Sequence, residues 1–120
     1  MNGAVLVVDD DVDIACNVID ILTDLGYDAD SAHDGAAALQ LVRQKSYDVA
    51  VLDFKMPGMD GATLYERIRQ LRPETIGILV TAYAGDDGVV RAKMAGVRQV
   101  LRKPVDLNLL LLRIDEAMRQ

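Results

Sequence analysis

Short apolar runs recur along the chain at spacings typical of buried strands. Three are almost unbroken, at residues 4–8, 48–52 and 76–80, and two weaker ones at 27–32 and 98–102 alternate apolar with polar positions. Short runs with few polar positions are typical of parallel strands that are covered on both faces. The pattern therefore predicts five strands.

Between the strands the apolar residues follow the spacing of helices. The first stripe ends at Gly26, which suits a helix C-terminus, and consists of Ile14, Val18, Ile21, Leu22 and Leu25. Further helices are predicted at 34–45, around Leu64, Ile68 and Leu71, at 86–95 with Val90 and Met94, and finally along Leu107, Leu110, Leu111, Ile114 and Met118. Strict alternation with short connections favours parallel strands and right-handed crossovers, hence an α/β three-layer sandwich.

Composition narrows the class of protein. The 120 residues, 51% of them apolar, suit one domain at 1–120 with a substantial core. Acidic residues outnumber basic ones by 19 to 13 and the basic ones are scattered, which speaks against direct nucleic-acid binding. No membrane span and no secretion signal is visible, so we expect a cytoplasmic location. The lone Cys16 lies near Ile14, Val18 and Ile19 and is predicted to be a packing residue.

Polar side chains follow four of the five predicted strands. They are Asp9, Asp10 and Asp11 after the first strand, Asp53 after the third, Thr81 after the fourth and Lys103 after the fifth. The carboxyl ends of parallel strands meet at one edge of the sheet, where ligands of such sheets bind. We therefore expect these side chains to lie close together.

The aspartates in this set require a cation. Asp11 alone is explained as the N-cap of the next helix, whereas Asp9, Asp10 and Asp53 would repel one another and raise each other's pKa values. Oxygen ligands favour a hard cation such as Mg²⁺, which takes one or two carboxylates and keeps several waters. Taken singly, Lys103 has the alternative interpretation of a structural counter-ion of Asp53, and Thr81 is equally explained as a helix cap. Taken together, these groups are what phosphoryl transfer needs.

The motifs at these strand ends resemble the receiver domain of bacterial response regulators. They are Asp9-Asp10, the pattern D-x-x-M-P-x-M-D-G from Asp53 to Gly61, Thr81-Ala82 and Lys103-Pro104. The resemblance covers the whole chain and implies a flavodoxin-like (βα)5 fold with a five-stranded parallel sheet in the order 2-1-3-4-5. It implies phosphorelay signalling by a domain that catalyses its own phosphorylation and dephosphorylation, not an enzyme with a separate substrate.

The resemblance also implies the role of each residue in the site. Asp53 accepts a phosphoryl group from the phosphohistidine of a sensor histidine kinase or a phosphotransfer protein. Mg²⁺, or Mn²⁺ in its place, is held by Asp9, Asp10, Asp53 and the main-chain carbonyl of Lys55. The phosphoryl oxygens are bound by Thr81 and Lys103, beside the small Ala82. A cis peptide is expected between Lys103 and Pro104.

Other positions bear on switching and partners. Val100 stands where the family often has an aromatic residue, and Lys55 and Tyr83 occupy positions that modulate phosphate loss. The family's partner surface, for an output domain or another protein, is formed by the fourth helix, the fifth strand and the fifth helix. Leu109 and Leu112 are predicted to be exposed there, and we hypothesise a homodimer through them. His33 is predicted to be a solvated loop residue.

Two alternatives to a phosphorylated receiver remain from the sequence. One is an aspartyl-phosphate phosphatase type of enzyme, because Asp9 and Asp11 have the spacing of its paired acids, although no substrate cap is present. The other is an interaction module on the receiver fold that is not phosphorylated. The chain is expected to be either a stand-alone receiver or one that belongs to a larger kinase or transcription factor.

Overall fold

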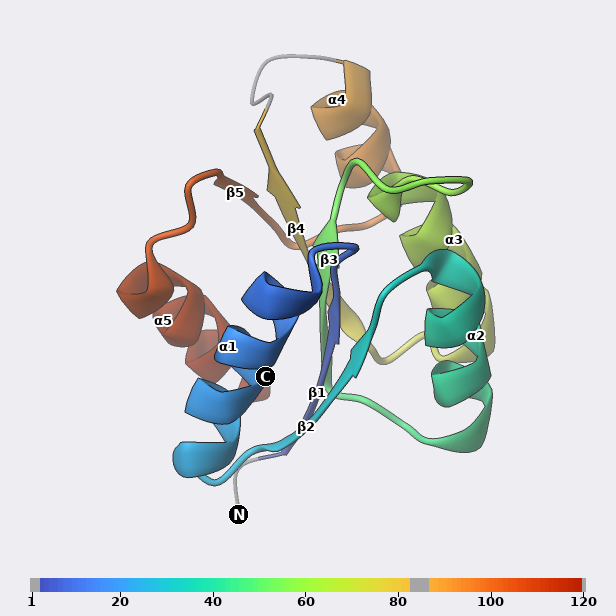
Figure 1. The fold of residues 1–120 in the computed structure, drawn as a ribbon. Coiled ribbons are helices and arrows are strands. Elements are labelled where there is room, and N and C mark those ends of the chain that lie inside the picture. The colour runs from blue at the N-terminus through green and yellow to red at the C-terminus, as the bar shows by residue number, and fades with distance from the viewer. Residues whose placement is uncertain (1–2, 83–86, 120) are drawn as a thin grey trace.

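Strands and helices alternate five times along the chain (Figure 1), and the computed structural model describes residues 3–82 and 87–119. The strands are β1 (Ala4–Val8), β2 (Asp28–Ala32), β3 (Val49–Asp53), β4 (Ile76–Thr81) and β5 (Gln99–Arg102). The helices are α1 (Val12–Asp24), α2 (Gly35–Gln44), α3 (Gly61–Leu71), α4 (Asp87–Met94) and α5 (Leu107–Met118). None of the described helices is long and apolar enough to cross a membrane.

The five strands form one parallel sheet in the order β2-β1-β3-β4-β5, which confirms the predicted fold class. Helices α1 and α5 cover one face of the sheet, and α2, α3 and α4 cover the other (Figure 1). Alternate strand residues supply the two cores: Leu6 and Val8 face α2 and α3, whereas Val5 and Val7 face α1 and α5. Each central strand is therefore apolar on both sides, as its unbroken sequence predicts.

Two strand ends differ from the prediction in a way that matters for the site. The third strand begins and ends one residue later than predicted, and the fourth extends to Thr81. Asp53 is thus the last residue of β3 and pairs in register with Val80 of β4. Because the sheet holds their backbones, the side chains of Asp53 and Thr81 have fixed positions.

Helix α1 buries only part of the predicted stripe. Val18 and Leu22 are buried as predicted, together with Ala15, whereas Ile14 and Leu25 are 47% and 50% exposed. Cys16 is exposed, so its predicted role as a packing residue is wrong. Helix α1 packs on β1 and β2 through the part of its surface around Ala15. The spacing of apolar residues had placed Ile14 in this contact instead. Gly26 follows the helix with a φ of 92°, as expected of a residue that ends it.

The last two helices also differ from the prediction. In α4, Val90 and Met94 are exposed, and Ala92 with the following Ala95 packs against the core instead. In α5, Leu110 and Ile114 are buried as predicted, together with Ala117, whereas Leu107, predicted to be buried, is 41% exposed. Leu109 and Leu112 are exposed as predicted, at 37% and 50%.

Candidate functional site

Sheet topology brings the three predicted metal ligands together. Strands β1 and β3 are neighbours with Val8 paired to Leu52, so that Asp9 and Asp53, the next residues, lie side by side. Carboxylate oxygens of Asp9, Asp10 and Asp53 all lie within 4.8 Å of one another. Asp9 and Asp53 are buried, at 7% and 5% exposure, and Asp10 is exposed. The donor set consists of oxygens alone, which suits a hard divalent cation.

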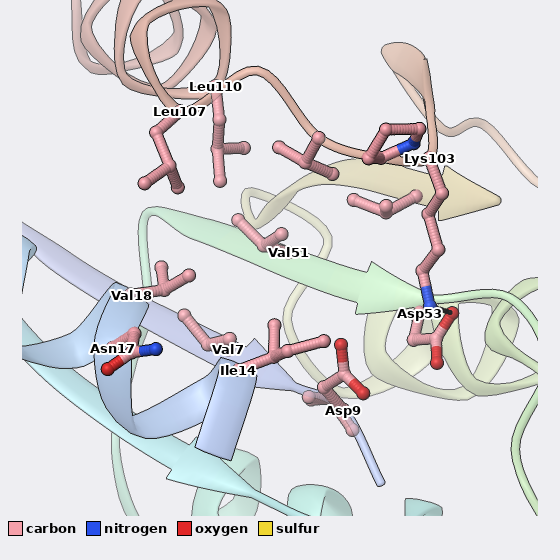
Figure 2. Close-up of a pocket in the computed structure, with 14 residues that line it drawn as sticks. Val7, Asp9, Ile14, Asn17, Val18, Val51, Asp53, Lys103, Leu107 and Leu110 are labelled. Atoms are coloured by element: carbon pink, nitrogen blue, oxygen red, sulfur yellow. Dashed lines mark ion pairs between the residues drawn. The ribbon is translucent and has the colours of Figure 1, made fainter. Parts of the chain in front are cut away.

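Lys103 reaches this cluster from the loop after β5. Its ammonium nitrogen lies 3.0 Å from Oδ1 of Asp53. Figure 2 shows the side chain of Lys103 pointing toward Asp53. The main-chain N–H of Lys103 donates to the carbonyl of Thr81, 2.8 Å away, and this bond holds the loop against the end of β4. The Lys103–Pro104 peptide is cis, which confirms the expectation for this turn. This ion pair is consistent with both interpretations of Lys103 from the sequence, as a counter-ion of Asp53 and as a residue that binds phosphoryl oxygens.

The charges in the site are not balanced. Burial raises the pKa of Asp53, and Asp9 and Asp10 add to this, against the opposing effect of the Lys103 ammonium. Burial alone would lower the pKa of Lys103, but the ion pair with Asp53 outweighs it and raises that pKa. One ammonium therefore does not offset three neighbouring carboxylates, and a further cation would relieve their repulsion.

Thr81 ends β4 directly across from the loop that carries Lys103. It is 2% exposed and is followed by the exposed Ala82. Thr81 is the last residue of β4, so the sheet holds its backbone in place. Lys55 is exposed in the turn after β3, whereas Tyr83 lies outside the described residues. Val100 is partly buried in β5 and packs against the core.

The turn after Asp53 depends on Gly61, a role that sequence reasoning missed. Gly61 is the first residue of α3, and its N–H donates to the carbonyl of Phe54 at 2.8 Å. A Cβ at this position would lie 2.6 Å from the main-chain oxygen of Asp53 and 2.7 Å from Cδ1 of Leu79. Glycine therefore allows α3 to begin in contact with the backbone that carries Asp53.

The other Asp of this motif, Asp60, anchors two helices. Its carboxylate accepts the N–H of Thr63 as the N-cap of α3. It also forms a two-pronged ion pair with Arg91 of α4, with nitrogen–oxygen distances of 2.9 and 3.3 Å. These contacts lower the pKa of Asp60 in spite of the opposing effect of burial. The end of the motif therefore ties α4 to the start of α3.

Asp11 and His33 border the site. Asp11 is the N-cap of α1 and accepts the N–H groups of Asp13 and Ile14, which confirms the capping interpretation. His33 is exposed, as predicted, but its Nδ1 lies 3.3 Å from the main-chain oxygen of Asp9. Strand β2 ends beside β1, and this places His33, the residue after β2, against the backbone of Asp9.

Comparisons with known proteins agree with this geometry. The family model for the response regulator receiver domain matches residues 5–115. A receiver domain protein (CheY-like) from Methanospirillum hungatei JF-1 has a solved structure that superposes with a TM-score of 0.94 at 32% identity, covering 99% of this chain and 95% of that one. A curated response regulator receiver protein of Anaeromyxobacter sp. (strain Fw109-5) is 38% identical over 100 residues, which are 83% of this chain. The chain belongs to the response regulator receiver family.

Membership of this family gives the chain its general function, phosphorelay signal transduction in a two-component system. The chain spans only part of its curated relatives. It matches 42% of the Anaeromyxobacter protein and 26% of the transcriptional regulatory protein ZraR of Klebsiella oxytoca, which is 34% identical over 114 residues. The similarity therefore concerns the receiver and not the remainder of those proteins.

Proposed function

We propose that this receiver, residues 1–120, takes a phosphoryl group from a protein phosphohistidine onto the carboxylate of Asp53. An oxygen of Asp53 attacks the phosphorus, the phosphorus–nitrogen bond of the donor breaks, and the released imidazole keeps the electron pair and takes up a proton. The observation that carries the proposal is a buried carboxylate at a strand end, paired with Lys103 at 3.0 Å and adjacent to two further acids.

The other residues of the site would support this transfer. The ammonium of Lys103 and the hydroxyl of Thr81 would bind the phosphoryl oxygens, which carry the negative charge of the transferred group. Ala82 is exposed and small, and so leaves the approach to Asp53 open. Release of the phosphoryl group to water would use the same residues, with Lys55 and Tyr83 affecting the access of water.

The acidic cluster fits Mg²⁺, with Mn²⁺ as a substitute. Asp9, Asp10 and Asp53 would hold the ion together with the main-chain carbonyl of Lys55. Bound there, the ion would offset carboxylate charge that otherwise repels an anionic phosphoryl donor. The raised pKa of Asp53 agrees with this assignment, because burial, together with Asp9 and Asp10, disfavours the charged carboxylate in spite of Lys103, and a bound cation would favour it.

A protein donor and a protein target are both supported by exposed apolar residues. Val12 and Ile14 of α1 lie beside the acidic cluster and are 50% and 47% exposed, which suits the approach of a histidine kinase or phosphotransfer protein. On the α4–β5–α5 face, Leu109 and Leu112 of α5 are exposed. We infer that this face contacts an output domain, a partner protein or a second copy, and that the chain works in the cytoplasm with its kinase.

The test of the phosphoacceptor is labelling by acetyl phosphate, which supplies the same phosphoryl group. Wild-type protein should take up label only with Mg²⁺ or Mn²⁺, and Asp53→Asn should take up none. Asp11→Asn is the matched control, because Asn also caps helices and the exposed Asp11 caps α1. Labelling of Asp53→Asn at the wild-type rate would refute the assignment.

Beryllofluoride, a phosphoryl mimic, separates the alternatives. With Mg²⁺ it should perturb the NMR signals around Asp53 in a phosphorylated receiver, and it should leave a module that is not phosphorylated unchanged. A phosphatase-type enzyme should instead bind it at Asp9. The structure offers little support for that enzyme, because the carboxylate of Asp11, its required second acid, is engaged with the N-terminus of α1.

A further inference from the structure

A cavity of about 290 Å³ lies next to the acidic cluster, between α1 and α5 (Figure 2). Its floor is formed by strand residues such as Val7 and Val51. Its sides include Ile14 and Val18 of α1 and Leu107 and Leu110 of α5. The proposed phosphoryl chemistry does not use this space, since Asp53 and Lys103 only border one end of it.

The cavity exists because short side chains meet where the two helices begin. The strand positions facing it are valines, and the loop that leads into α5 adds another, Val105, which is only partly buried. Leu107, at the first turn of α5, lines the cavity and yet is 41% exposed. Protein interiors normally leave few voids larger than a water molecule. Apolar surface at this place is therefore left open to an occupant.

The size of the cavity sets the size of that occupant. An apolar cavity of about 150 Å³ accepts a benzene ring, and small-molecule sites begin near about 300 Å³. The space between α1 and α5 is thus large enough for one aromatic ring or a short alkyl chain, together with one polar head group. Its walls are almost wholly apolar, as small-molecule sites usually are.

The charged residues at one end of the cavity determine which charge the head group of an occupant should carry. The lining has two carboxylates, those of Asp9 and Asp53, and one ammonium, that of Lys103. Lys103 is paired with Asp53, while Asp9 accepts the N–H of Asp11 at 2.9 Å. This end therefore carries an excess of negative charge, and a cationic head group is complementary to it whereas a carboxylate is not.

We propose that the cavity binds a small primary amine whose apolar body is the size of one aromatic ring. The ammonium group lies against Asp9 and Asp53, and the body lies between Ile14 and Leu107. The same two carboxylates belong to the acidic cluster, so the amine and a divalent cation exclude one another. It follows that such an amine opposes phosphorylation of Asp53, a consequence that rests on the proposed function.

Binding is tested with benzylamine, followed by NMR in the absence of any phosphodonor. Benzylamine should shift the signals of Val7, Val51 and Leu110, and Mg²⁺ should displace it. Benzyl alcohol keeps the ring without the charge, and methylamine keeps the charge without the ring, so both should bind at least about tenfold more weakly. Because no phosphoryl group is involved, the result is independent of whether Asp53 accepts phosphate.

Two variants fill the cavity from different sides. Val105→Phe and Leu107→Phe should each weaken benzylamine by about ten- to a hundredfold, the effect of excluding a ring-sized group, and leave Mg²⁺ affinity unchanged. Leu112→Phe makes the same exchange at an exposed position of α5 away from the cavity and should have no effect. If either filling variant fails to fold, the other decides.

Three results would overturn the proposal. The first is no binding of benzylamine to the wild-type protein, and the second is equal binding by a folded filling variant. The third is binding of benzyl alcohol as tight as that of benzylamine without competition from Mg²⁺, which would assign the cavity to neutral apolar molecules and remove the carboxylates from recognition.

Discussion

At the scale of single residues, the charged carboxylate of Asp53 is in an unfavourable electrostatic environment. Its carboxylate is almost completely buried and has two acids and one ammonium as neighbours. The pKa of Asp53 is raised, because burial and the neighbouring acids together outweigh the ion pair with Lys103. In the absence of a metal ion, ionised Asp53 therefore makes the folded protein less stable than a neutral group of the same shape would.

We therefore expect Asp53→Asn to unfold at a higher temperature than the wild type at neutral pH in a chelator. The folded-state pKa of Asp53 is above its unfolded value, so the contribution of this group is favourable below the folded pKa and is lost as the pH rises through it. The Tm difference should be a few degrees and should shrink at acidic pH, where Asp53 is neutral in both states.

Thermal unfolding followed by circular dichroism at several pH values measures this difference. Adding Mg²⁺ is the internal control, because a bound cation stabilises the wild type more than the variant and should narrow the gap. An Asp53→Asn protein that unfolds at the same temperature as the wild type in chelator, or at a lower one, would contradict the electrostatic account.

At the scale of the elements, the starts of the helices position the site. Asp11, Asp34, Asp60 and Asp106 cap α1, α2, α3 and α5 with their carboxylates. Helices α2 and α3 both begin with glycine, at Gly35 and Gly61, but the two glycines have different surroundings. Gly61 faces the backbone of Asp53, whereas Gly35 faces the flexible side chain of Met59.

This pair of glycines gives a matched test. Gly61→Ala would place its Cβ 2.6 Å from the main-chain oxygen of Asp53, so either α3 or the end of β3 must move. We expect a loss of about 1–3 kcal/mol in the free energy of unfolding and slower labelling of Asp53. Gly35→Ala should change both much less, because the Met59 side chain can move aside.

Chemical denaturation and acetyl phosphate labelling of the two variants provide the measurements. If Gly61→Ala were as stable and as quickly labelled as Gly35→Ala, the close approach of α3 to β3 would not be needed to place Asp53. Both substitutions add the same methyl group at the first position of a helix, so differences in helix propensity largely cancel.

At the scale of the whole molecule, the sheet order separates the phosphoacceptor from the proposed output face. Asp53 lies on the central strand β3, and β5 lies at the edge of the sheet. Helices α4 and α5 flank that edge from opposite sides, each with exposed apolar residues. A partner on this face would contact β5 and its preceding and following helices, and Lys103, directly after β5, links the face to Asp53.

If the face is a dimer interface, Leu109→Ser with Leu112→Ser should weaken self-association about tenfold or more, because two apolar side chains would no longer be buried. Folding and Asp53 labelling should be unchanged. The matched control is Leu25→Ser with Leu71→Ser, which removes two similarly exposed leucines from the ends of α1 and α3. Sedimentation velocity at high concentration, with and without beryllofluoride, measures the effect. Identical sedimentation of all three proteins would exclude the dimer.

Much of this molecule follows from local pattern. Unbroken apolar runs identified the central strands, and helical spacing identified all five helices to within a few residues. The site residues Asp9, Asp10, Asp53 and Lys103 were predictable as one cluster because parallel strands end at a common edge. The strand order came from resemblance to the family, since alternation of strands and helices permits several orders.

The sequence by itself determined the class of fold and the chemistry of the site, because strand and helix periods and strand-end residues are properties of neighbouring positions. Only the tertiary structure decided which apolar residues are covered. Cys16, Met94 and Leu107 suited a buried stripe, yet are exposed, because the arc of a helix that its neighbours cover depends on how the elements pack. The closeness of Gly61 to Asp53, the contact of His33 with Asp9 and the cavity between α1 and α5 have the same origin. Each joins residues that are not neighbours in the chain, and the packing of the sheet against the helices brings them together.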